Sequence, residues 1–241
     1  MISVVIPAHN EEPYIGGGIR AVRRAAEELP EEETEIIVVC NRCTDGTAAL
    51  ASELGARVVV NDARSISAVR NAGVRAARGS VILTVDADSA MSPGALGEAK
   101  ELLASGKYVG GGTRAKFDRM SLGILVSTAY VVWQLLPTML RQKAALSGGM
   151  FWFYKEDWEA LGGFDESLVS LEDRDFAVRL NELGKSRGQK YGTLRRSWIV
   201  TSSRKFDQFG DWYLIRDRAM VKRLFTGRDR EAADRFYYDV R

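Results

Sequence analysis

Two short acidic clusters are the parts of this chain best suited to chemistry. The first is the Asp-Ala-Asp at 86–88, which follows the apolar run 81–85, and the second begins with Glu172 and Asp173. An Asp-x-Asp at the end of a strand places two hard oxygen ligands together, which suits a divalent cation that carries a diphosphate. A later acidic pair can supply a general base. Together the clusters suggest transfer from a nucleotide-activated donor to an acceptor hydroxyl.

Strands that alternate with helices must position the first cluster. Short apolar runs predict strands at 2–6, 35–39, 57–60 and 81–85, and helical periodicity predicts helices at 14–29, 47–54, 67–77 and 92–105. This alternation predicts an α/β fold with a largely parallel central sheet. Because ligands bind beyond the carboxyl ends of such strands, the segments 7–11, 40–45 and 86–88 should meet in one crevice.

The pattern changes after residue 105. It predicts strands at 107–113 and 146–154, a short helix at 155–161 and an amphipathic helix at 172–183. Gly148 and Gly149 would allow the chain a close approach to donor or acceptor, and a purely steric turn is the alternative. The segment 121–140 contains no charged residue and nears the length of a membrane span. Its polar residues favour a buried helix or one on a membrane surface instead.

The composition is that of a globular protein with one large core. The chain has 241 residues, of which 46% are hydrophobic and 27% charged. We expect a catalytic domain at 1–206, with a donor-binding half at 1–105 and an acceptor-binding half at 106–206, followed by a basic helical extension at 207–241. No nucleic-acid partner is expected.

Positive charge gathers near the end of the chain. Residues 186–241 carry 14 Lys and Arg against 7 Asp and Glu, whereas the remainder has 20 against 25. A basic amphipathic helix is predicted at 209–225. It would pack on the catalytic domain or on a dimer partner, or else lie on an anionic membrane, where a lipid-linked acceptor becomes plausible. A solvated basic face is the plainer explanation.

The only two cysteines, Cys40 and Cys43, form a Cys-x-x-Cys. Since His9 is the only histidine, a zinc site built from cysteine and histidine is not expected. Packing at a strand–helix junction is favoured over a redox role. The chain shows no disulfide framework and begins directly with a strand, so we expect a cytoplasmic protein, at the inner face of the membrane if its helices dock there.

Several motifs in order resemble those of family 2 glycosyltransferases, which have the GT-A fold. They are IPAHNEE at 6–12, CNRCTDGT at 40–47, VRNAGVRAARGSVILTVDAD at 69–88, SGGMFWFYKEDWEALGGFDESL at 147–168 and EDRDFAVRL at 172–180. The likeness covers roughly residues 1–206. It implies a Rossmann-like three-layer sandwich, a nucleotide-sugar donor linked to UDP or GDP, and Mn²⁺ or Mg²⁺ as cofactor.

The resemblance also implies roles for individual residues. Asp88 would be the principal metal ligand, with Asp86 at the ribose or metal, and Asp173 would be the base beside Glu172. The remaining donor-site candidates are Pro7, His9, Asn10 and Glu11 around the nucleoside, then Asn41, Arg70, Ala87, Arg204 and Lys205. Asn41 stands where the family often has an aspartate that contacts the base, so a carboxylate cannot recognise uracil here. Arg204 and Lys205 would supply charge to the diphosphate, in place of a late histidine.

The chemistry follows from these assignments. A cation held by Asp88 neutralises the leaving diphosphate, and a carboxylate such as Asp173 takes the proton of the attacking hydroxyl. Because direct displacement assisted by a base inverts the anomeric centre, we predict an inverting transferase.

Alternatives remain at the level of sequence. The chain could be a catalytically silent nucleotide-sugar-binding or scaffold protein, or a nucleotidyltransferase, although the segment after the first strand lacks the Gly-rich phosphate loop of the latter. Glu172 and Asp173 could be helix N-terminal acids, Arg70 a surface arginine, and Arg204 and Lys205 a surface basic pair.

Overall fold

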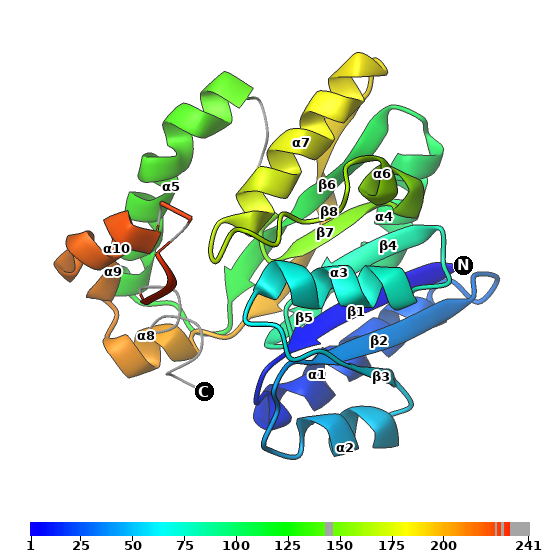
Figure 1. The fold of residues 1–241 in the computed structure, drawn as a ribbon, viewed down its shortest axis with the longest axis horizontal. Coiled ribbons are helices and arrows are strands. Elements are labelled where there is room, and N and C mark those ends of the chain that lie inside the picture. Colours follow the sequence, from blue (N-terminus) through cyan, green and yellow to red (C-terminus); the bar gives the residue numbers. More distant parts are fainter. Residues whose placement is uncertain (143–146, 225, 228, 232–241) are drawn as a thin grey trace.

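A computed structural model describes residues 1–142, 147–224, 226–227 and 229–231. Within these residues, eight strands form one sheet in the order β3-β2-β1-β4-β7-β6-β8-β5 (Figure 1). The strands are β1 (Ile2–Ala8), β2 (Thr34–Cys40), β3 (Arg57–Val60), β4 (Val81–Val85), β5 (Ser89–Met91), β6 (Tyr108–Phe117), β7 (Met150–Tyr154) and β8 (Lys190–Thr201). The helices are α1 (Glu12–Glu27), α2 (Thr47–Glu53), α3 (Ile66–Ala76), α4 (Ala95–Ala104), α5 (Leu122–Gln142), α6 (Lys155–Ala160), α7 (Glu172–Ser186), α8 (Arg204–Phe209), α9 (Tyr213–Arg216) and α10 (Arg218–Leu224).

The first four strands that the sequence predicts form the parallel half of the sheet. β1 lies between β2 and β4, and β3 pairs with β2, all in parallel. Every residue of β1 and β4 is buried, which explains why these strands read as continuous apolar runs and not as alternating ones. The carboxyl ends of three adjacent strands therefore lie at one edge of the sheet.

The second half of the sheet is mixed. β7 is antiparallel to both β4 and β6, and β8 runs parallel to β6 but antiparallel to β5. Four of the seven pairings among the described strands are parallel, so the sheet is mostly parallel as predicted. β5 and β8 are absent from the sequence-based prediction, because short or charged strands give a weak apolar signal.

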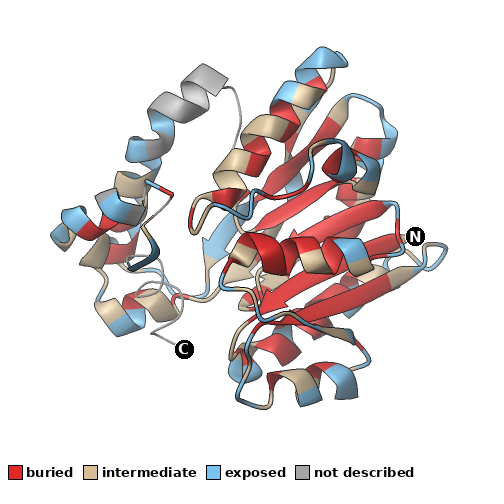
Figure 2. Cartoon of the chain, in the orientation of Figure 1, coloured by how far each residue is buried: buried red, intermediate tan, exposed pale blue. Residues whose placement is uncertain are grey.

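Helices cover both faces of the sheet. Side chains of α1 and α4 pack on one face with Trp152 of β7, and side chains of α3 and α7 pack on the other with Phe151 and Phe153. Alternate residues of β7 thus serve opposite cores, as the two-residue period of a strand requires. The buried sheet between two helical layers is visible in Figure 2 and agrees with the predicted three-layer sandwich.

Helices α5, α8, α9 and α10 stand at the edge of this sandwich (Figure 1). α5 extends away from the sheet beside α8, α9 and α10 (Figure 1). A helix is confirmed over the uncharged segment 121–140, and no helix in the described part of the chain is long and apolar enough to cross a membrane. The single helix predicted at 209–225 is wrong. Gly210, with φ of 86°, ends α8, and α9 and α10 follow as separate short helices. Residues 232–241 of the predicted extension lie outside the described residues.

Candidate active site

The carboxyl ends of β1, β2 and β4 open into a cavity of about 330 Å³. Ten of the fifteen residues predicted for the site line it: Pro7, His9, Glu11, Asn41, Arg70, Asp86, Ala87, Asp88, Glu172 and Lys205. Asn10, Gly148, Gly149, Asp173 and Arg204 are not part of its lining. The predicted meeting of the three strand-end segments in one crevice therefore holds.

At one end of the cavity lies Asn41, which is 2% exposed. Its side-chain amide nitrogen donates hydrogen bonds to the carbonyl oxygens of Asn61 (2.6 Å) and Ala63 (2.8 Å), whereas its backbone carbonyl oxygen lies 2.6 Å from Nδ1 of His9. The two hydrogen bonds from the amide nitrogen fix the orientation of the Asn41 side chain. Asn10, in the left-handed conformation, accepts a hydrogen bond from the backbone of Thr44, so it shapes the adjoining turn and does not face the cavity.

Arg70 links the two acidic clusters. Its Nη2 donates to Oδ1 of Asp86 at 2.9 Å, and its Nε lies 3.8 Å from Oε1 of Glu172. The interpretation of Arg70 as a surface arginine is wrong, since the residue is 6% exposed. Burial, together with the neighbouring carboxylate of Asp173, raises the pKa of Glu172 to about 7, although the Arg70 cation opposes the shift.

A second arginine organises the opposite wall. Both terminal nitrogens of Arg204 lie 2.6 Å from the carboxylate oxygens of Glu11, and Nη2 also lies 3.0 Å from Oδ2 of Asp88. The guanidinium of Arg204 stacks over the ring of Tyr14, and its Cζ atom lies 4.6 Å from the ring centroid. Arg204 is therefore bound into the site and is not half of a surface basic pair.

The loop before β7 joins the first acidic cluster to Asp173. The backbone N–H of Asp86 donates to the carbonyl of Gly149 at 3.2 Å, and the hydroxyl of Ser147 donates to Oδ2 of Asp173 at 3.0 Å. Gly148 has φ of 62°, and a Cβ there would lie 2.2 Å from the carbonyl oxygen of Thr113. The close approach at this glycine is thus to the protein's own backbone, which no other residue would permit.

Asp86 and Asp88 present carboxylates that fit a divalent cation only in part. Their side chains are 40% and 13% exposed, and each already contacts an arginine. No group of three or more potential ligands that could hold a metal occurs in the described ranges. A Mg²⁺-type ion commonly takes one or two protein carboxylates and completes its shell with phosphate oxygens and water. Two aspartates that line a cavity of about 330 Å³ fit that arrangement.

Residues far along the chain complete the cavity wall. Phe117, Val169, Tyr213, Leu214 and Arg230 line it, and none was predicted. Arg230 donates to the carbonyl of Arg64 at 2.8 Å, and the amide of Val169 donates to the carbonyl of Gly227 at 3.0 Å, so the C-terminal segment packs against the loops before α3 and α7. No sequence motif marks the lining residues of the C-terminal segment. They reach the cavity through the packing of α9 and α10, which the sequence pattern does not reveal.

The two cysteines lie beside Asn41. Cys40 is buried in the core, whereas Cys43 is half-buried with its sulfur 3.5 Å from the carbonyl oxygen of Ala8. A hydrogen bond between the two thiols, with burial, raises the pKa of Cys40, and the same hydrogen bond lowers the pKa of Cys43 to about 7. Both thiols are free, and they pack at a strand–helix junction as the sequence suggested.

Comparison with known proteins places this geometry in context. The model of the family described as glycosyl transferase family 2 matches residues 3–158. Chondroitin synthase of Escherichia coli is 26% identical over 194 residues, which cover 76% of this chain and 27% of that protein. The chain spans less than half the length of the first curated relatives it matches.

Solved structures with the same fold include two glycosyltransferases. TarS from S. aureus in complex with UDP-GlcNAc superposes with a TM-score of 0.63 at 17% identity, over 99% of this chain and 71% of that one. Glucosyl-3-phosphoglycerate synthase from Mycobacterium tuberculosis, solved with Mn²⁺, UDP and phosphoglyceric acid, superposes with a TM-score of 0.60 at 18% identity. The match covers 95% of this chain and 78% of that one. These likenesses confirm the predicted GT-A fold.

Proposed function

Because the chain belongs to glycosyl transferase family 2, we propose that it transfers a sugar from a nucleoside diphosphate to an acceptor hydroxyl. One observation carries the proposal: a single cavity collects Asn41, the carboxylates of Asp86 and Asp88, and Glu172 from three separate segments. A nucleotide sugar needs these elements in that order, namely a base site, a diphosphate site and an acidic group near the anomeric carbon.

The donor would lie with its base at Asn41 and its diphosphate at Asp88. A Mg²⁺ or Mn²⁺ held by Asp86 and Asp88 would supply positive charge to the leaving diphosphate. Arg204, which now contacts Asp88, is placed to turn toward a phosphate oxygen while it keeps one bond to Glu11. UDP in the structures of TarS and glucosyl-3-phosphoglycerate synthase favours a UDP-linked donor, and Mn²⁺ in the latter favours that cation.

Asp173 is the proposed base. The Ser147 hydroxyl fixes one of its carboxylate oxygens, and the other accepts from the backbone N–H of Arg174 at 2.7 Å. A base held in this way takes the proton of the acceptor hydroxyl as it attacks the anomeric carbon, and the diphosphate leaves from the opposite side. Transfer would therefore invert the anomeric configuration.

Hydrolysis of nucleotide sugars tests the proposal without knowledge of the acceptor. We expect slow release of nucleoside diphosphate from at least one UDP- or GDP-sugar in the presence of Mn²⁺, and its loss in Asp88→Ala. Asp62→Ala is the matched control, since Asp62 is exposed and is not part of the cavity lining. Equal release by wild type and Asp88→Ala would overturn the assignment of the diphosphate site.

A further inference from the structure

Exposed apolar side chains gather on one surface of the molecule. Among the described residues, nine large hydrophobic side chains are exposed, and eight of them lie between Met120 and Leu136 or at Trp212. These eight, here called the α5 patch, are Met120, Leu122, Leu125, Val126, Val132, Trp133, Leu136 and Trp212. Trp133 and Leu122 are 66% and 69% exposed. A concentration of this kind marks a surface that binds something apolar.

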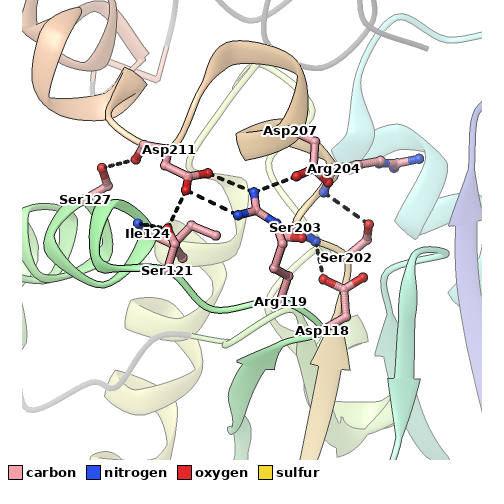
Figure 3. Close-up of polar contacts among 10 residues, drawn as sticks. All are labelled: Asp118, Arg119, Ser121, Ile124, Ser127, Ser202, Ser203, Arg204, Asp207 and Asp211. Atoms are coloured by element: carbon pink, nitrogen blue, oxygen red, sulfur yellow. Dashed lines mark hydrogen bonds and ion pairs between the residues drawn. The ribbon is translucent and has the colours of Figure 1, made fainter.

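Polar contacts hold the opposite side of α5 in place, as Figure 3 shows. Asp211 accepts hydrogen bonds from Arg119 at 2.8 Å and from the hydroxyl of Ser121, and the buried hydroxyl of Ser127 donates to the Asp211 carbonyl at 2.7 Å. A Cβ on Gly123 would lie 3.1 Å from the indole nitrogen of Trp212. The inner side of the helix is thus satisfied by its neighbours, and its apolar side remains directed outward.

The charges around the α5 patch are mostly positive. The uncharged segment 121–140 is followed by Arg141 in the sequence, whereas Arg119 before it is paired with Asp207 and Asp211. Next to it, residues 216–224 carry four Lys or Arg against one Asp. Arg216 and Arg218 are exposed without a carboxylate partner in the described part of the chain, and the guanidinium carbon of Arg218 lies 5.9 Å from the ring centroid of Tyr130.

An anionic bilayer fits these properties better than a second copy of the chain. In a two-fold dimer the patch would face itself, which brings the basic residues at its edge toward one another. A lipid surface with negative headgroups instead attracts arginines while it accepts the apolar side chains below them. Tryptophan at the edge of such a surface is favoured at the headgroup level.

Residues that line the cavity adjoin the α5 patch along the chain. Phe117 lines the cavity three residues before Met120, and Tyr213 and Leu214 line it directly after Trp212. We infer that the α5 patch docks on an anionic membrane surface and so holds the cavity at the level where a lipid-linked acceptor would present its hydroxyl. The acceptor part of this inference rests on the proposed function, whereas membrane binding does not.

Vesicle sedimentation tests the docking directly. The full chain should sediment with phosphatidylcholine vesicles that contain phosphatidylglycerol, and the double variant Leu125→Ser with Trp133→Ser should bind them at least about tenfold more weakly. Arg216→Gln with Arg218→Gln should weaken binding to the anionic vesicles by about tenfold. The four substituted side chains are exposed, so we expect the variants to keep the wild-type melting temperature. Measuring that temperature shows whether the variants fold.

Val60→Ser is the matched control, because Val60 is 71% exposed on β3 and lies outside the patch. It should bind vesicles as the wild type does. The inference fails if the wild type does not sediment with anionic vesicles, or if Val60→Ser loses as much binding as the patch variant. It fails equally if light scattering shows that the wild type is a dimer and the patch variant a monomer, while neither protein binds vesicles. Donor hydrolysis by the patch variant should stay at the wild-type rate, so the two proposals can fail separately.

Discussion

Arg204 and Glu11 form a two-point ion pair across 193 residues of sequence, with both N–O distances at 2.6 Å. Glu11 follows the end of β1 and is 1% exposed, whereas Arg204 begins α8 after the last long strand. The pair joins the first and last strand ends of the catalytic body. It also places a cation beside Asp88, which the proposed function requires to bind metal and diphosphate.

Loss of the arginine should cost stability. Arg204→Ala removes the two charge-assisted hydrogen bonds that the buried Glu11 carboxylate accepts from Arg204, so we expect the free energy of unfolding to fall by about 3 kcal/mol. Adding Glu11→Gln should recover part of this loss, since the buried charge is then gone. Urea unfolding of the two single variants and the double variant measures the coupling. Arg216→Ala, an exposed arginine, should stay near wild type, and strictly additive losses would refute the coupling.

Asp173→Asn should separate binding from chemistry. The amide keeps a hydrogen-bond acceptor for Ser147 but cannot take a proton, so donor affinity should persist while the transfer rate falls by about 10²–10⁴-fold. Steady-state kinetics with an acceptor found by screening provides the measurement. Asp175→Asn is the control, since Asp175 lies on the same helix and pairs with Arg179. Near wild-type transfer by Asp173→Asn would mean that another group is the base.

The pH dependence of stability should report on Glu172. Its pKa is raised from 4.5 to about 7, so between these values the native state keeps a proton that the unfolded chain has lost. The native state then binds more protons, and the free energy of unfolding falls as pH rises, by at most about 1.4 kcal/mol per pH unit. Glu172→Gln should remove this fall. Urea unfolding across that pH window, for both proteins, measures the difference, and parallel curves would contradict the shift.

The two cysteines should differ in reactivity. The pKa of Cys43 is about 7 and its thiol is half-buried, whereas Cys40 is buried with a raised pKa. Because the thiolate is the nucleophile, iodoacetamide at neutral pH should alkylate Cys43 well before Cys40. Mass spectrometry of the digested protein gives the order. In Cys43→Ser, Cys40 should remain unlabelled under the same conditions, and equal labelling of both residues would show that the thiols are not distinguished.

The parallel half of the fold could be predicted because its strands are buried on both faces. Continuous apolar runs fix β1, β2 and β4, and parallel pairing then brings their carboxyl ends together. β8 could not be recognised in the same way, since Arg195 and Arg196 interrupt its apolar pattern. The insertion of β7 between β4 and β6 depends on long-range pairing, which local patterns do not encode.

The sequence predicted the residue types of the candidate site, but not the ion pairs that these residues form with one another. The acidic motifs could be recognised because their chemistry needs carboxylates at a strand end. The ion pairs of Arg70 with Asp86 and of Arg204 with Glu11 join distant segments, so only the tertiary structure reveals them. Tyr213 and Leu214 were missed because the helix predicted as continuous over 209–225 is interrupted at Gly210, and Arg230 was missed because it lies beyond that helix in a segment without a motif.

Thermal stabilisation by nucleotides tests the central claim most directly. The melting temperature of the wild type should rise with at least one of UDP, GDP or dTDP, and only when Mn²⁺ or Mg²⁺ is present, because a ligand stabilises the folded state that binds it. Asp88→Ala should lose this rise and Asp62→Ala should keep it. A wild-type melting temperature that no nucleotide raises in the presence of metal, or a rise that Asp88→Ala retains in full, would contradict a nucleotide-sugar site at this cavity.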